Sequence, residues 1–116
     1  MHRARLFFSL GHYRLAKQWA RRGLEAATPM SRAAAVALNG LCILECLTGA
    51  YEAATRHADE LVEMVDRRGF RFIEASALLN RAAAGLATGG YRGALGDIRR
   101  AHELARKAGD AEDQFW

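Results

Sequence analysis

A short motif, Gly-x-Tyr-x-x-Ala, occurs three times in this chain of 116 residues and constrains its fold more than any other feature. The copies begin at Gly11, Gly49 and Gly89, so they are spaced 38 and 40 residues apart. A stretch of about 16 residues with helical periodicity follows each copy. Repetition at a nearly constant spacing of this size is the sequence signature of stacked helical units.

Each motif predicts a tight turn between two antiparallel helices. Glycine adopts the left-handed backbone that ends a helix, the tyrosine ring is expected to pack across the hairpin, and the alanine lets the two helices approach closely. This interpretation predicts helices at 2–9, 12–27, 31–48, 51–68, 71–88 and 91–108, with the start of a seventh at 111–116.

Predicted helix ends elsewhere agree with this map. Two helices end with a pair of cations followed by a glycine, at 67–69 and at 106–109, and this combination is typical of a helix C-terminus. The single proline, Pro29, separates the second and third helices, where Thr28 or Ser31 is available as an N-cap.

Residues 44–54 read Leu-x-x-Leu-x-Gly-x-Tyr-x-x-Ala and resemble the tetratricopeptide repeat. The resemblance covers nearly the whole chain and implies an all-α, right-handed α-solenoid of three antiparallel hairpins in a single domain, 1–116. The hairpins would cover about 1–28, 29–69 and 70–109, and 110–116 would start a capping or further helix.

Two features depart from the common form of this family. The family period is about 34 residues, shorter than the spacing here, and Leu38 or Leu78 stands where a large aromatic residue is frequent. The longer helices resemble the variant found in bacterial regulators, such as the large ATP-dependent transcriptional activators related to the maltose-regulon activator.

Stacked hairpins present a concave face, lined by the first helix of each pair, that suits a peptide or a helix. Aligning the repeats on their glycines places these candidate partner-binding residues there: Arg5, Phe8, Val36, Asn39, Ile43, Ser76, Asn80 and Ala83. Asn39 and Asn80 are the strongest candidates, because an amide offers a peptide backbone both a donor and an acceptor. The alternative is that each amide only bonds a neighbouring helix or water.

Chaperone-adaptor members of the family grip a C-terminal carboxylate with cations on successive first helices. The matching positions here are Met1, Arg5, Gly40, Ser76 and Asn80, of which only Arg5 is cationic. The sequence therefore predicts no carboxylate clamp.

Charge is concentrated at one end of the chain. Residues 1–40 hold seven basic residues against one acidic residue, whereas residues 41–116 hold ten basic against twelve acidic. Arg14, Lys17 and Arg21 share one face of a helix and form a basic stripe that could meet nucleic acid or an acidic partner. The alternative is an ordinary solvated face, and no aromatic residues interleave with the stripe to stack on single-stranded bases.

Residue patterns typical of enzymes are not found. The four histidines are scattered, without the spacing of metal ligands. Cys42 and Cys46 stand where the repeat requires small packing residues, so we expect structural thiols rather than ligands or a disulfide. The glycine run 89–93 lacks the strand and the lysine of a phosphate-binding loop. The sequence predicts no enzyme activity, no metal and no cofactor.

No segment reaches the roughly 18 apolar residues of a membrane span, and no secretory signal is recognised, so we expect a cytoplasmic protein. Apolar ends, at 6–8 and 115–116, predict end-to-end association or a missing neighbour. The leading hypothesis is a protein-interaction module for a peptide, a helix or a partner domain. The alternatives are a sensor or scaffold segment of a bacterial transcriptional regulator and, third, a nucleic-acid binder.

Overall fold

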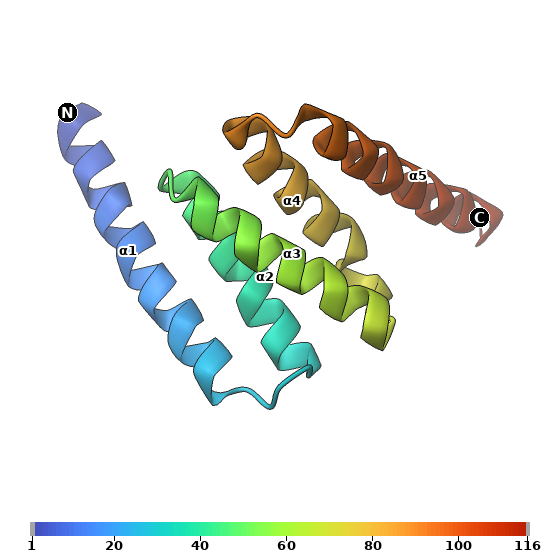
Figure 1. The fold of residues 1–116 in the computed structure, drawn as a ribbon, viewed down its shortest axis with the longest axis horizontal. Helices are drawn as coiled ribbons and strands as arrows, with labels where there is room; N and C mark the ends of the chain where they lie inside the picture. The colour runs from blue at the N-terminus through green and yellow to red at the C-terminus, as the bar shows by residue number, and fades with distance from the viewer. Residues whose placement is uncertain (1, 116) are drawn as a thin grey trace.

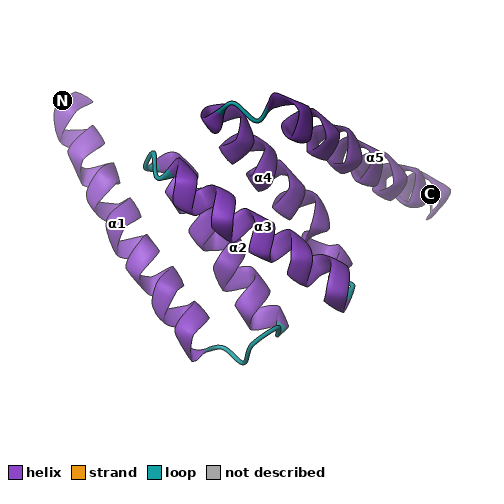
Figure 2. Ribbon diagram, viewed as in Figure 1, coloured by secondary structure: helices purple, strands orange, loops and turns teal. Residues whose placement is uncertain are grey.

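The computed structural model describes the backbone of residues 2–115 and the side chains of residues 11–110. Over this range the chain is all helical, as the sequence predicts (Figure 1, Figure 2). The elements are α1 (His2–Ala26), α2 (Arg32–Leu47), α3 (Tyr51–Arg68), the short 3-10 helix η1 (Arg71–Ile73), α4 (Glu74–Thr88) and α5 (Tyr91–Phe115).

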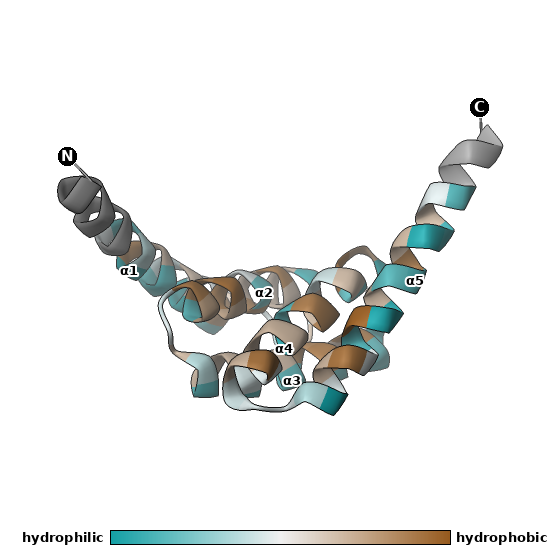
Figure 3. Ribbon diagram, turned by 90° about the horizontal axis from the view of Figure 1, so that it is seen from above, coloured by the Kyte–Doolittle hydropathy of each residue, from teal (hydrophilic) through white to brown (hydrophobic). Residues whose placement is uncertain are grey.

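Each helix packs antiparallel against the next one along the chain, and α2 also contacts α4 (Figure 1). Figure 3 shows α1 and α5 on the two flanks of the molecule, with α2, α3 and α4 between them. Helices α2, α3 and α4 supply most of the buried core, which includes Leu38, Leu61, Val65 and Ala77. Burial of each large aliphatic side chain contributes about 1.5–3 kcal/mol.

Two of the three motif glycines form the predicted turns. Gly49 and Gly89 have φ angles of 80° and 90° and lie between α2 and α3 and between α4 and α5, a conformation that side-chain-bearing residues adopt only with strain. The alanine that follows each of these two glycines is buried, Ala54 at 0% and Ala94 at 3% exposure. The predicted close approach of the paired helices is therefore confirmed for α2–α3 and for α4–α5.

The first copy of the motif does not form a turn. Gly11 lies inside α1, which runs without a break from His2 to Ala26, so the predicted separate helices 2–9 and 12–27 and the hairpin at 1–28 are wrong. Glycine weakens a helix interior by only about 1 kcal/mol, and the packing of α1 against α2 compensates for that loss.

The predicted end of the last helix is also wrong, because its glycine, like Gly11, lies inside a helix and does not end it. Helix α5 continues through Gly109 to Phe115, so no further helix starts at 111–116. Asp110 accepts a hydrogen bond of 3.0 Å from Arg106 on the preceding turn, an i,i+4 pair that supports continuation of the helix.

The tyrosine rings of the motif do not pack across their hairpins as expected. Tyr51 is 41% exposed and Tyr91 is 67% exposed. The small residues leave no room for a ring between the helices, since a Cβ added at Gly85 would lie 3.7 Å from the Cβ of Ala94. Tyr91 therefore stands at the N-terminus of α5 mainly in solvent, and Tyr51 stands at the N-terminus of α3 and is partly covered.

Other predicted helix boundaries are confirmed. Ser31 is the N-cap of α2, and its side chain accepts a hydrogen bond of 3.1 Å from the backbone N–H of Ala34. Gly69 ends α3 in the left-handed conformation after two arginines. None of the helices in the described part of the chain is long and apolar enough to cross a membrane.

Candidate partner-binding face

Helix α2 exposes a row of large apolar side chains on the side opposite its core-facing residues. Val36, Ile43 and Leu47 are 55%, 39% and 56% exposed. They recur at i, i+7 and i+11, which keeps them on one side of an α-helix. The residues that α2 buries lie on the opposite side, and they are Ala34, Ala35, Leu38, Leu41, Cys42 and Glu45.

Helix α4 carries a matching exposed row. Leu79 and Leu86 are 50% and 47% exposed, and the exposed Ala83 lies between them on the same side. Arg81 lies on the other side of the helix, where it contacts Asp59 of α3 at 3.7 Å. The row on α4 therefore faces away from α3, as the row on α2 does.

The two rows together form one face of the molecule, because α2 and α4 pack against each other and both pack against α3. Apolar residues recur along the ribbons of both helices (Figure 3). We call this surface the α2–α4 face and define it by six residues: Val36, Ile43, Leu47, Leu79, Ala83 and Leu86. Large contiguous apolar patches on a protein surface are where contact with a partner is sought first.

A hydrogen-bonded amide network joins the two helices beside this face. Asn39 Nδ2 donates to Ser76 Oγ at 3.1 Å, and Asn80 Nδ2 donates to Asn39 Oδ1 at 2.6 Å. The Ser76 hydroxyl can in turn donate to Asn39 Oδ1, at 3.3 Å. The amides predicted to bind a partner thus bond neighbouring helices, which was the alternative interpretation, and they fix the distance between α2 and α4.

The predicted partner-binding residues are only partly brought together. Val36, Ile43 and Ala83 belong to the α2–α4 face, and the amide network lies along it. Arg5 and Phe8 belong to α1, but their side chains are outside the described residues.

Leu47, Leu79 and Leu86 were missed in the sequence. Their signal is the helical spacing of apolar residues that remains once the core-facing row is removed. That subtraction requires knowing which side of each helix is covered.

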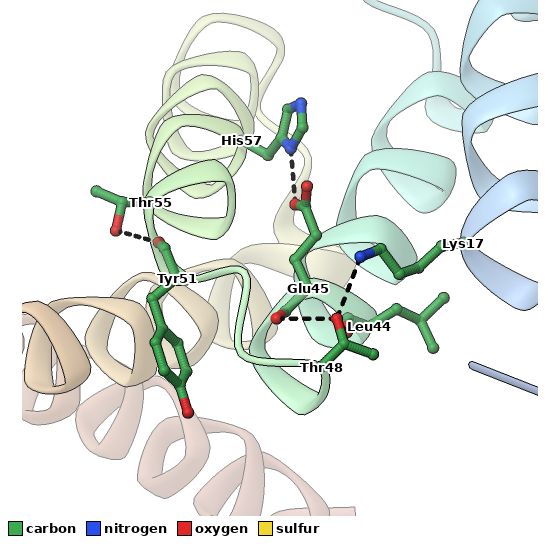
Figure 4. Close-up of polar contacts among 7 residues, drawn as sticks. All are labelled: Lys17, Leu44, Glu45, Thr48, Tyr51, Thr55 and His57. Carbon is green, nitrogen blue, oxygen red and sulfur yellow. Dashed lines mark hydrogen bonds and ion pairs between the residues drawn. The ribbon is translucent and has the colours of Figure 1, made fainter. Parts of the chain in front are cut away.

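One of the three residues of the predicted basic stripe lies in a contact between helices. Lys17 Nζ donates a hydrogen bond of 3.1 Å to Thr48 Oγ1 at the end of α2 (Figure 4), so this side chain is held in the contact between α1 and α2. Arg14 and Arg21 are exposed to solvent. The three side chains therefore do not form one fully exposed basic row, because Lys17 is partly buried and bonded to Thr48.

Beneath the α2–α4 face, a buried carboxylate ties α2 to α3. Glu45 is 1% exposed, and its Oε1 lies 2.7 Å from Nδ1 of His57 (Figure 4). Cys42 lies one turn before Glu45 and is fully buried, and burial, followed by the charge of Glu45, raises the pKa of its thiol to about 12. A thiol that keeps its proton is neither a nucleophile nor a metal ligand.

Both cysteines are free thiols, Cys42 buried and Cys46 partly buried. Among the residues that the structure describes, no group of three potential ligands could hold a metal ion.

A second polar cluster ties α3, α4 and α5 together. Arg81 of α4 makes two hydrogen bonds to the carboxylate of Asp97 on α5, at 2.7 and 2.8 Å. This bidentate geometry is the strong form of an arginine–carboxylate pair. The bonds to Asp97, together with its charge and that of Asp59, raise the pKa of Arg81, so the cation is fixed where the three helices meet.

Comparison with protein-family models, with curated proteins and with solved structures finds no match to this chain. The resemblance to the tetratricopeptide repeat therefore stays a prediction from the sequence motifs, and any function has to be argued from the site itself.

Proposed function

We propose that this chain is a tetratricopeptide-like α-solenoid that binds a partner protein or peptide on the α2–α4 face. The observation that carries the proposal is the pair of exposed apolar rows, on α2 and on α4, held side by side by the Asn39–Ser76–Asn80 network. A stack of hairpins presents its first helices to a partner in this way.

The size and chemistry of the face favour a helix or an extended peptide as the ligand. The row from Val36 to Leu47 runs along three turns of α2, a length of about 16 Å. A hydrogen-bond acceptor is also available at the edge of the α2–α4 face, because the side-chain oxygen of Asn80 accepts no hydrogen bond from the described residues. The apolar rows would supply affinity, and this oxygen would receive an N–H group from the ligand.

The test compares capture of partners from cytoplasm by the wild-type chain and by single variants. Val36→Lys and Leu79→Lys place a cation on the face, and each should reduce capture of the same partner at least about tenfold. Leu15→Lys is the matched control, since Leu15 on α1 has the same exposure as Val36, 55%, and lies outside the face.

All three variants should unfold at nearly the wild-type temperature, because the substituted side chains are exposed. If Val36→Lys and Leu79→Lys retain the partner as well as Leu15→Lys does, the α2–α4 face is not the binding site.

A further inference from the structure

Helix α5 exposes a second apolar surface, which lies outside the α2–α4 face. Tyr91, Leu95 and Ile98 are 67%, 49% and 38% exposed and recur along one side of the helix. Arg99 lies beside them, is exposed, and makes no ion pair with any residue that the structure describes. We call these four residues the α5 flank.

The repeat in the sequence allows the α5 flank to be compared with the equivalent residues of α3. Gly49 and Gly89 form equivalent turns before α3 and α5, so a residue of α3 corresponds to the residue 40 positions later in α5. The α5 flank, Tyr91, Leu95, Ile98 and Arg99, then corresponds to Tyr51, Thr55, Ala58 and Asp59 of α3.

On α3, these positions are in contact with α4. Tyr51 lines a cavity together with Thr88, the last residue of α4. Thr55 and Asp59 line a second cavity, of about 240 Å³, together with Arg81. The remaining residue of the four, Ala58, is fully buried. Helix α4 therefore covers this side of α3, whereas no described helix covers the same side of α5.

The charges at equivalent positions are opposite. Asp59 of α3 pairs with Arg81 of α4 at 3.7 Å, but the corresponding residue of α5 is Arg99. About two turns earlier the same inversion recurs, with Glu52 on α3 and Arg92 on α5. A helix that covered α5 as α4 covers α3 would therefore need a carboxylate where α4 carries Arg81.

We propose that the α5 flank binds an acidic amphipathic helix of a partner protein, seated on α5 as α4 is seated on α3. Its apolar side covers Leu95 and Ile98, and one of its carboxylates pairs with Arg99. A second copy of this chain fits less well. At its other end, the exposed apolar residues Leu15 and Trp19 of α1 stand beside the cations Arg14 and Arg22. These cations would meet Arg99 where a carboxylate is needed.

The inference is independent of the proposed function, because the α5 flank and the α2–α4 face share no residue. Substitutions on one surface therefore test that surface alone.

The test uses two peptide probes with the sequence of α4, residues 74–88, and capped ends. One probe keeps the arginine at the position of Arg81, and the other carries glutamate there. The glutamate probe should bind the whole protein about fivefold more tightly, since like charges at Arg99 are replaced by opposite charges. Its binding should shift the backbone amide NMR signals of residues 91–102.

A charge exchange on the protein completes the test. Arg99→Glu should reverse the preference, so that the arginine probe binds more tightly. Arg100→Glu is the matched control, because Arg100 is an exposed residue on the other side of α5 whose 3.7 Å ion pair with Glu103 is solvent-exposed. This variant should keep the preference for the glutamate probe.

Three results would overturn the proposal: no binding of either probe, equal binding of both, or a preference that Arg99→Glu does not reverse. Sedimentation of the protein alone tests whether a second copy of this chain occupies the α5 flank. A concentration-dependent dimer that Leu95→Asp abolishes would mean that a second copy, and not an acidic helix, occupies the α5 flank.

Discussion

One position of the repeat carries the polar contact across each helical hairpin. His57 and Asp97 are equivalent residues, 40 positions apart, and each pairs with the preceding helix, His57 with Glu45 and Asp97 with Arg81. Trp19 occupies the same position relative to Gly11. No described helix is paired with α1 on that side, and Trp19 is 61% exposed, with the guanidinium of Arg22 5.4 Å from its ring.

The pair between Glu45 and His57 should stabilise the fold only while both members are present. Removing one partner of a buried pair leaves an unpaired polar group, whereas apolar replacement of both partners is close to neutral. His57→Ala should therefore lower the free energy of unfolding by about 3 kcal/mol. The double variant Glu45→Leu with His57→Leu should recover most of that loss in urea unfolding. A double variant less stable than His57→Ala would contradict this account.

Cys42 should make the stability of the fold depend on alkaline pH. The pKa of its thiol is raised by burial from 9.0 to about 12, so between these values the unfolded chain releases a proton that the folded chain retains. The contribution is complete below about pH 9 and is lost as the pH rises toward 12. Cys42→Ala should reduce the loss of stability over this window by up to about 4 kcal/mol. Urea unfolding at several pH values measures it, with Cys46→Ala, which removes a less buried thiol, as the control.

At the scale of elements, identical motifs gave different structures because glycine only permits a turn and does not require one. Gly49 and Gly89 take the left-handed conformation, whereas Gly11 stays helical within α1. The difference lies in the tertiary packing: Ala54 and Ala94 are buried against a preceding helix, and α1 has no such partner among the described helices. A single sequence does not show which copy of a motif lacks its packing partner, so two of the three hairpins could be predicted and the first could not.

Substitution of the same motif residue should therefore change stability in opposite directions. Gly11→Ala should raise the free energy of unfolding by about 0.5–1 kcal/mol, since alanine favours a helix interior and no atom lies within 4 Å of the added Cβ. Gly89→Ala should lower it by about 1–2 kcal/mol because of the left-handed backbone. Thermal unfolding followed by circular dichroism distinguishes the two cases, and equal effects at both positions would contradict the structure.

At the scale of the whole molecule, helices contact mainly their neighbours along the chain. The all-helical architecture could be predicted from this kind of local information, namely periodicity and turn residues. The candidate site could be predicted only in part, because the exposure of Leu47, Leu79 and Leu86 depends on which sides of α2 and α4 are covered by α3. The strongest candidates from the sequence were polar, Asn39 and Asn80, and these two side chains bond each other.

Nearest-neighbour packing predicts a gradient of local stability. Hydrogen exchange should be slower in α2, α3 and α4, each of which packs against at least two other helices, than in α1, which contacts α2 and lies at one edge. Arg81→Met should speed exchange in α5 more than in α1, because Arg81 holds Asp97 of α5. Mass spectrometry of exchanged peptides measures these rates. Uniform acceleration along the whole chain would instead indicate a single cooperative unit.

The two interhelical pairs also bear on how a repetitive chain finds its correct partners while it folds. The α2–α3 and α4–α5 hairpins are similar enough that, during folding, α5 could take the place of α3 beside α2. Likewise, α3 could take the place of α5 in the hairpin with α4. In the first of these misassembled hairpins, Asp97 would lie near Glu45, and in the second His57 would lie near Arg81. Two carboxylates would meet in the first and two basic groups in the second. The opposite polarity of the two native pairs therefore discourages exchange between the hairpins, and a chain in which both pairs had the same polarity would lose that discrimination.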